Sequence, residues 1–211
     1  MICGNVLRSF MPPRGLLLVG GFAPPKTGRL VQAGFKFNFF DDRLSVTADV
    51  YRAALTNVAT DIPGTGFQVL AGSLVTRGVE LSVNGRLFPG LNTSANYTYS
   101  NQVVVHDGAS EVPRHSGNMW MIYDLQGERW HGWGAGVGIE ARSGYQFYSD
   151  FICRIPGQMK TDLSVYYHAK QWSATLGVKN IFNRTLYESQ SSIALPLQAG
   201  RLVFLTSYYN F

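Results

Sequence analysis

The C-terminal stretch Arg201-Leu-Val-Phe-Leu-Thr-Ser-Tyr-Tyr-Asn-Phe211 decides how the rest of the chain is interpreted. Counted back from the end, every second residue forms one side of an extended strand, and this side is apolar except for a small serine: Phe211, Tyr209, Ser207, Leu205 and Val203. Chain termini usually fray in water. An apolar side that continues to the last residue therefore predicts that the C-terminal strand is held in a sheet. This side is expected to face an apolar medium, either a protein core or lipid.

The same two-residue alternation recurs along the whole chain, as in Leu44-Ser-Val-Thr-Ala-Asp-Val50. Alternation of this kind is typical of strands with one buried face. It predicts nine strands and a partial tenth: Leu30–Phe40, Leu44–Val58, Leu74–Phe88, Leu91–Val105, Ser116–Leu125, Gly132–Tyr145, Lys160–His168, Trp172–Phe182 and Arg201–Phe211, with Asn5–Met11 as the partial strand. Most are about ten residues or longer, whereas globular strands are typically 5–6 residues and tilted membrane strands about 9–11.

The connections between these strands alternate in length. Short turns are expected at Asp41-Asp42, Phe88-Pro-Gly90, Gln126–Arg129 and His168–Gln171. Long loops are expected at Pro12–Gly28, Ala59–Ser73, His106–Arg114, Phe147–Gln158 and Asn183–Gly200. Short turns at one end and long loops at the other are typical of an up-and-down membrane barrel.

The composition agrees with this interpretation. Of the 211 residues 15% are charged, against about 25% in soluble domains, and 13% are aromatic. No apolar run approaches the roughly 18 residues of a membrane-spanning helix. The net charge is +5, but the basic residues are scattered singly from Arg8 to Arg201, which argues against a nucleic-acid site. Many aromatic residues sit near strand ends, as in an interfacial girdle, although an ordinary sheet core is the alternative: Phe39, Phe40, Phe88, Trp130, Trp133, Tyr145, Trp172, Tyr209 and Phe211.

The sequence carries no catalytic or metal-binding motif. Cys3 and Cys153 match no metal spacing, and the four histidines show neither metal spacing nor a nearby Asp or Ser partner pattern. No nucleophile elbow, zinc-protease motif or phosphate loop is present, so we expect no enzyme activity. In Gly132-Trp-Gly-Ala-Gly-Val-Gly138 the glycines alternate within a strand, which removes bulk from one face and leaves room for whatever fills the lumen.

Charged residues occupy the polar side of the expected sheet. In a closed barrel they would point into the lumen and pair across strands: Asp49, Glu80, Arg86, Glu140, Arg142, Asp162 and Lys179. A structural charge lattice is the favoured role, and a contribution to transport is the alternative.

Several segments together resemble one known family. They are Gln32-Ala-Gly-Phe-Lys36 with Asp41-Asp-Arg-Leu44, Arg77-Gly-Val-Glu-Leu81 with Phe88-Pro-Gly-Leu91, Asn96-Tyr-Thr-Tyr99, Val112-Pro-Arg-His115, Val178-Lys-Asn-Ile-Phe-Asn-Arg184 with Tyr187, and Gly200-Arg201 with Phe211. In type and order they resemble the barrel of TonB-dependent outer-membrane receptors, especially ferric-siderophore receptors. Gln32 stands where the family usually has Glu.

This resemblance implies an all-β, antiparallel up-and-down transmembrane barrel of 22 strands with an N-terminal plug. It also implies the outer membrane of a Gram-negative bacterium, a ferric siderophore as ligand, and energy from the TonB–ExbB–ExbD complex. We expect this chain to hold about 9–10 C-terminal strands without the plug: residues 1–27 form a partial strand and outer loop, and residues 28–211 form barrel. On this interpretation the chain does not transport alone, and iron enters only as a chelate, not as a resident cofactor.

The resemblance also suggests where a ligand and the membrane would be contacted. Aromatic and basic residues of the outer loops could stack on or pair with an anionic chelate, with ordinary loop packing as the alternative: Tyr145, Phe147, Tyr148, Arg154 and Tyr187. On the terminal strand, Val203, Leu205, Tyr209 and Phe211 would face lipid, and this strand resembles the signal that the barrel-assembly machinery recognises. Two other functions remain open at this point: a small passive pore of ten closed strands, and a soluble β-sandwich binding module.

Overall fold

The computed structural model describes residues 1–13, 15–62, 64–104, 112–148, 152–188 and 196–211. Ten strands form one antiparallel sheet in the order β1-β2-β3-β4-β5-β6-β7-β10-β11-β12. Their bounds are β1 Ile2–Met11, β2 Lys26–Phe39, β3 Leu44–Asp61, β4 Gln68–Phe88, β5 Leu91–Val104, β6 His115–Asp124, β7 Trp133–Arg142, β10 Gln158–His168, β11 Trp172–Lys179 and β12 Leu202–Tyr209. Two short strands, β8 (Tyr145–Tyr148) and β9 (Ile152–Ile155), form a separate hairpin between β7 and β10.

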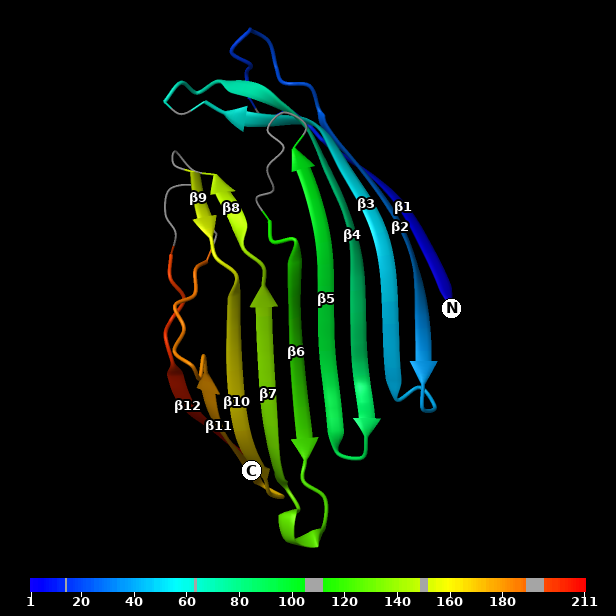
Figure 1. Ribbon diagram of the computed structural model, residues 1–211, viewed down its shortest axis with the longest axis vertical. Coiled ribbons are helices and arrows are strands. Elements are labelled where there is room, and N and C mark those ends of the chain that lie inside the picture. The colour runs from blue at the N-terminus through cyan, green and yellow to red at the C-terminus, as the bar shows by residue number, and fades with distance from the viewer. Residues whose placement is uncertain (14, 63, 105–111, 149–151, 189–195) are drawn as a thin grey trace.

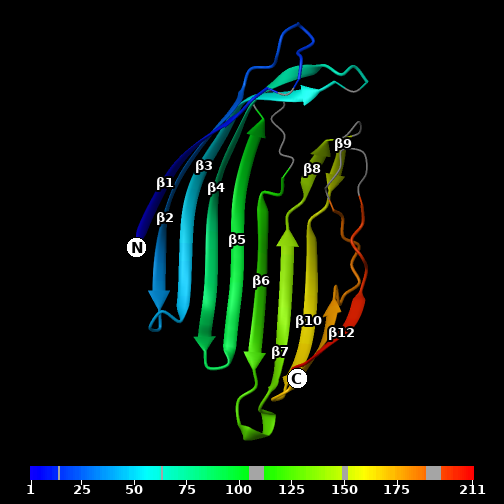
Figure 2. The ribbon, with the colours of Figure 1, turned by 180° about the vertical axis from the view of Figure 1, so that it is seen from behind.

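The large sheet is curved and open (Figures 1 and 2). Strands adjacent in sequence are adjacent in the sheet, apart from the inserted hairpin, so the topology is up-and-down as predicted. Over the described residues β1 and β12 lie at opposite edges and do not pair with each other. The fold is therefore a partial barrel. It contradicts a closed ten-stranded pore, and a single sheet of ten strands contradicts a β-sandwich.

Connections differ between the two ends of the sheet, as expected. At one end, lowest in Figure 1, lie the short turns that follow β2, β4 and β10, together with a short 3₁₀ helix, η1 (Glu128–Trp130), between β6 and β7. The β2–β3 turn has three consecutive residues in the left-handed region: Phe40, Asp41 and Asp42. We call this end the short-turn rim and the opposite end the long-loop rim.

One predicted loop, Ala59–Ser73, is wrong. β3 continues to Asp61 and β4 begins at Gln68, so most of this segment is paired strand. The pairing shifts between Leu55 and Ala59, where Asn57 has a φ of 57° and donates from Nδ2 to the Pro25 carbonyl at 2.8 Å. This bulge breaks the two-residue alternation, and the continued pairing beyond it is hidden from a pattern-based prediction.

Other boundaries also differ from the prediction. The expected loop Phe147–Gln158 contains the second half of β8 and all of β9, and β2 begins earlier, at Lys26. The partial strand is a full partner of β2, from Ile2 to Met11. β11 ends at Lys179, short of the expected Phe182, because the next residue has a left-handed φ of 50° and turns the chain away from the sheet.

The register sorts the side chains onto two faces. One, the polar face, carries the directly opposed Asp49–Glu80 and Glu140–Lys160 pairs. The other, the apolar face, carries large side chains that remain exposed, such as Phe35 (50%), Val50 (56%) and Leu205 (72%). Soluble monomers rarely expose so continuous an apolar surface, so this face is suited to lipid. Among the described residues, no helix is both long and apolar enough to cross a bilayer.

Candidate functional site

The strongest polar cluster lies on the polar face where β7 and β10 pair. Lys160 is directly opposite Glu140, and Lys160 Nζ lies 2.8 Å from Glu140 Oε2 and 4.0 Å from Asp162 Oδ2. Lys160 was not among the predicted lattice residues. The alternation of Lys160, Asp162 and Ser164 along one strand is the signal that could have placed it on this face.

The remaining predicted lattice residues divide into two groups. Near the cluster, Asp162 Oδ1 accepts the Asn180 backbone N–H at 2.8 Å, and the Arg142 guanidinium donates to the Tyr187 carbonyl. Further along the sheet, Lys179 Nζ lies 5.6 Å from the centre of the Phe204 ring. These charges bond mainly to backbone and to a ring, so they hold segments of the chain in place more than they pair with one another.

Asp49 and Glu80 lie outside that cluster. They face each other directly across β3 and β4, although both are acidic. Within the described part of the chain no basic side chain comes within 4.0 Å of either carboxylate. Arg86 lies near the short-turn end of β4, beside a register shift. The structure therefore does not join all seven predicted charges into one lattice.

The segment after β11 is fastened to the polar face. Asn180 is 2% exposed, and its side chain accepts the Arg184 backbone N–H and donates to the Arg184 carbonyl at 2.9 and 2.8 Å. Tyr187 N–H donates to Gln158 Oε1 at 2.6 Å, and Leu186 is buried. The Val178–Arg184 motif with Tyr187 thus has a structural role: it straps this segment over β7 and β10.

The five candidate ligand residues lie in two places. The β8–β9 hairpin at the long-loop rim carries Tyr145 and Arg154, which lie in successive residue pairs and therefore on opposite faces of the hairpin. It also carries the backbones of Phe147 and Tyr148, whose side chains lie outside the described part. Tyr145 is 7% exposed and pairs with the buried Ile155, whereas Arg154 is exposed. Tyr187 is on the strapped segment. Ligand contact by these residues stays a prediction.

The alternating glycines have a specific neighbour on the polar face. A Cβ on Gly138 would lie 2.1 Å from the Trp120 ring, and one on Gly134 would lie 2.2 Å from the Tyr166 ring. Tyr166 Oη in turn donates to Asp124 Oδ1 at 2.6 Å. The room that the glycines leave is therefore taken by aromatic rings from the two strands that flank β7.

A groove of about 250 Å³ lies beside these rings and runs along the polar face. Its walls include the amides of Asn96 and Asn118, joined at 3.0 Å, and the Lys160–Asp162 charges. The groove can bind polar solutes or a polar protein surface by hydrogen bonds. It contains no metal-binding cluster, since the described residues hold no group of three or more His, Cys, Asp or Glu side chains suited to a metal ion.

The C-terminal strand places its alternating apolar side chains on the apolar face, as the sequence pattern predicted. Val203, Leu205 and Tyr209 are 60%, 72% and 57% exposed on β12. Phe211 follows the strand, and its ring meets that of Tyr209 edge-on at 5.1 Å. Asn210 N–H donates to the Gln171 carbonyl at 2.8 Å, so this end lies at the short-turn rim.

A curved up-and-down sheet with an exposed apolar face, a charged polar face and unequal rims defines the wall of a membrane β-barrel. Residues 8–181 match the family model described as "TonB dependent receptor-like, beta-barrel". The chain belongs to the TonB-dependent receptor family, and the match lies in the barrel.

Relatives and solved structures agree with this assignment. The chain is 32% identical over 198 residues to the metal-pseudopaline receptor CntO of Pseudomonas aeruginosa, covering 87% of this chain and 27% of that receptor. It is 24% identical to the ferric-pyoverdine 358 receptor of Pseudomonas putida, covering 96% of this chain and 26% of that receptor. The solved structure of the pyoverdine outer membrane receptor FpvA from Pseudomonas aeruginosa PAO1 superposes with a TM-score of 0.86 at 18% identity, over 100% of this chain and 34% of that one. That likeness bears on the fold. The chain spans about a quarter of the length of the two receptors it matches in sequence.

Proposed function

We propose that this chain supplies part of the barrel wall of a receptor that imports a ferric siderophore across the outer membrane of a Gram-negative bacterium. The observation that carries the proposal is the family match over residues 8–181 on a sheet with one lipid-suited and one polar face. In such a receptor the TonB–ExbB–ExbD complex supplies energy, and the barrel-assembly machinery inserts the wall into lipid. The protein acts as a transporter without catalysis, and iron is cargo rather than a resident cofactor.

A second candidate ligand is another metal chelate. The 32% identity to a metal-pseudopaline receptor, against 24% to a ferric-pyoverdine receptor, favours it. Both candidates are metal complexes of organic chelators, so they share the chemistry expected at the long-loop rim: aromatic stacking and pairing with Arg154. The two candidate ligands are distinguished by measuring the uptake of both chelates in the same assay.

Because the chain spans about a quarter of CntO, its transport role is tested in a chimera. The aligned barrel segment of CntO is replaced by this chain in a host that lacks the parent receptor. Uptake of radiolabelled ferric pyoverdine and metal-loaded pseudopaline is then measured with and without TonB. We expect TonB-dependent uptake of one of them. Uptake by the chimera that persists unchanged without TonB would instead indicate a passive pore. In a separate liposome assay, energised import by this chain alone would contradict the expectation that it does not transport by itself.

The same chimera tests the predicted ligand arginine. Arg154→Gln removes an exposed cation from the β8–β9 hairpin, and we expect the KM for uptake to rise about tenfold, the order of one charge-assisted contact. The matched control is Arg43→Gln, an exposed arginine in the β2–β3 turn at the opposite rim. An equal rise in both variants would show that loss of positive charge, rather than contact at the hairpin, sets the KM.

A further inference from the structure

Four arginines that are scattered in the sequence form one row on the apolar face. Arg8 is directly opposite Arg29 across β1 and β2, and Arg52 is directly opposite Arg77 across β3 and β4. Arg29 and Arg52 are diagonal neighbours, since Arg29 pairs with Ala54 and Arg52 with Val31. With strands about 4.8 Å apart, the row extends roughly 14 Å across the sheet.

The row interrupts the continuous apolar band on these strands. On β3 the apolar-face residues from the short-turn rim upward are Leu44, Val46, Ala48 and Val50, and Arg52 follows. On each neighbouring strand a similar outward run reaches an arginine: β1 at Arg8, β2 at Arg29 and β4 at Arg77. Beyond the row the face still carries single apolar residues, Phe10 on β1 and Val75 on β4. The arginines therefore lie where hydrocarbon would give way to head groups on the long-loop side.

The positive charges of the row have no counter-charge within the protein. All four arginines are exposed, and in the described part of the chain no carboxylate lies within 4.0 Å of any of their guanidinium groups. The acidic residues nearest along β3 and β4, Asp49 and Glu80, point to the polar face. Like charges placed directly opposite each other are unfavourable, so two such pairs side by side indicate a bound anion that the chain does not itself provide.

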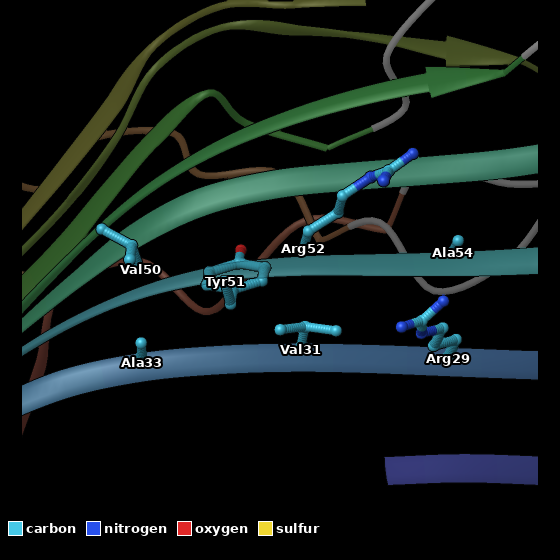
Figure 3. Close-up of a pocket in the computed structure, with 7 residues that line it drawn as sticks. All are labelled: Arg29, Val31, Ala33, Val50, Tyr51, Arg52 and Ala54. Atoms are coloured by element: carbon cyan, nitrogen blue, oxygen red, sulfur yellow. The ribbon is translucent and has the colours of Figure 1, made fainter. Parts of the chain in front are cut away.

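The side chains leave space for that anion. A groove of about 560 Å³ lies at the middle of the row, beside Arg29 and Arg52, and its other lining residues include Val31, Val50 and Ala54. Figure 3 shows the Arg29 side chain extending from β2 toward β3, and that of Arg52 extending from β3 toward β4. The two guanidinium groups stay apart, and Val31 lies on β2 directly opposite Arg52. The floor is apolar and the guanidinium groups are separated, which suits an amphiphile with a charged head.

We propose that this row, Arg8, Arg29, Arg52 and Arg77, binds the phosphate groups of a phosphorylated membrane lipid in the leaflet on the long-loop side. Guanidinium groups bind phosphate oxygens in pairs, and two opposed pairs match a head group that carries two phosphates. The apolar residues below the row contact the acyl chains. The site is separate from the polar face, and it rests on the proposed membrane location but not on chelate transport.

The test uses the full chain in neutral detergent, titrated with bisphosphorylated lipid A and followed by native mass spectrometry. In Arg29→Gln/Arg52→Gln we expect binding to weaken roughly 25-fold, about fivefold for each juxtamembrane arginine. Arg29→Lys/Arg52→Lys keeps the charge and should stay within about fivefold of the parent. The matched control Arg43→Gln/Arg129→Gln removes two exposed arginines at the short-turn rim and should stay within about twofold. Circular dichroism checks that every variant keeps its sheet.

Three results would overturn the proposal. The first is an equal loss of binding in the control pair, which would make the effect one of net charge. The second is equal binding of lipid A that lacks both phosphates. The third is full displacement of the lipid by an equal concentration of inorganic phosphate, which would show a simple anion site. Because no chelate is present, a negative result leaves the proposed transport function standing, and failure of the chimera leaves the lipid site standing.

Discussion

The two rims of the apolar face carry different chemistry. At the short-turn rim, Trp133, Tyr167 and Trp172 form a run of ring contacts with centres 5.0 and 5.3 Å apart. Toward the long-loop rim the same face carries the row of arginines on β1 to β4. Aromatic rings suit the head-group level of any bilayer, whereas unpaired guanidinium groups suit an anionic one. The difference teaches that the side chains at the two rims of one sheet can set its orientation in an asymmetric membrane. The apolar band between the rims does not distinguish the two orientations.

The largest effect is expected from placing a charge inside the uniform band. Leu81→Arg puts a guanidinium on the apolar face of β4, and we expect the free energy of unfolding in neutral phospholipid vesicles to fall by about 2–4 kcal/mol. The measurement is a reversible urea titration. If the band is not in hydrocarbon, the loss will be no larger than at an ordinary exposed site.

The adjacent residue provides the control for this variant. Glu80→Arg introduces the same side chain on the polar face, opposite Asp49, where it replaces a like-charge pair by an opposite-charge pair. We expect no loss of stability there. Equal destabilisation by both substitutions would contradict the assignment of the two faces.

An intermediate effect is expected at the aromatic rim. Tyr167 lies between Trp133 and Trp172, and Tyr167→Ala removes two ring contacts, each of about 0.5–1.5 kcal/mol. We expect the same urea titration to show a loss of about 1–3 kcal/mol. Tyr208→Ala, at an exposed position on the polar face of β12, is the control. A similar loss in the control would mean that the rim contacts add nothing specific.

The two-residue alternation of apolar and polar side chains was enough to predict the face of the sheet on which each side chain lies, wherever a strand is regular. Val203, Leu205 and Tyr209 lie on the apolar face because alternation in a strand leaves one choice once the first residue is placed. The same rule failed beyond Val58, since the bulge at Asn57 inserts residues that shift the pairing. The strand past the bulge therefore looked like a loop.

Contacts between strands could not be predicted from the pattern, because they depend on register. Glu140 and Lys160 are 20 residues apart in sequence, and only the pairing of β7 with β10 places them opposite each other. The arginine row is the clearest case: Arg8, Arg29, Arg52 and Arg77 are isolated in the sequence, and four neighbouring strands bring them into line. The scattered basic residues thus concealed a cluster.

The smallest expected effect distinguishes the two rims most sharply, because the sign of the change in the free energy of unfolding depends on the lipid. Arg77→Gln removes one member of the opposed Arg52–Arg77 pair, so in neutral lipid it should stabilise the fold by about 0.2–1 kcal/mol. In 1 M salt, where the screening length is about 3 Å, this gain should shrink. In vesicles that contain bisphosphorylated lipid A the same substitution should destabilise, since the arginine then has a phosphate partner. Arg43→Gln at the short-turn rim should show no such reversal, and a stabilisation of Arg77→Gln that keeps its sign in both lipids would remove the distinction between the rims.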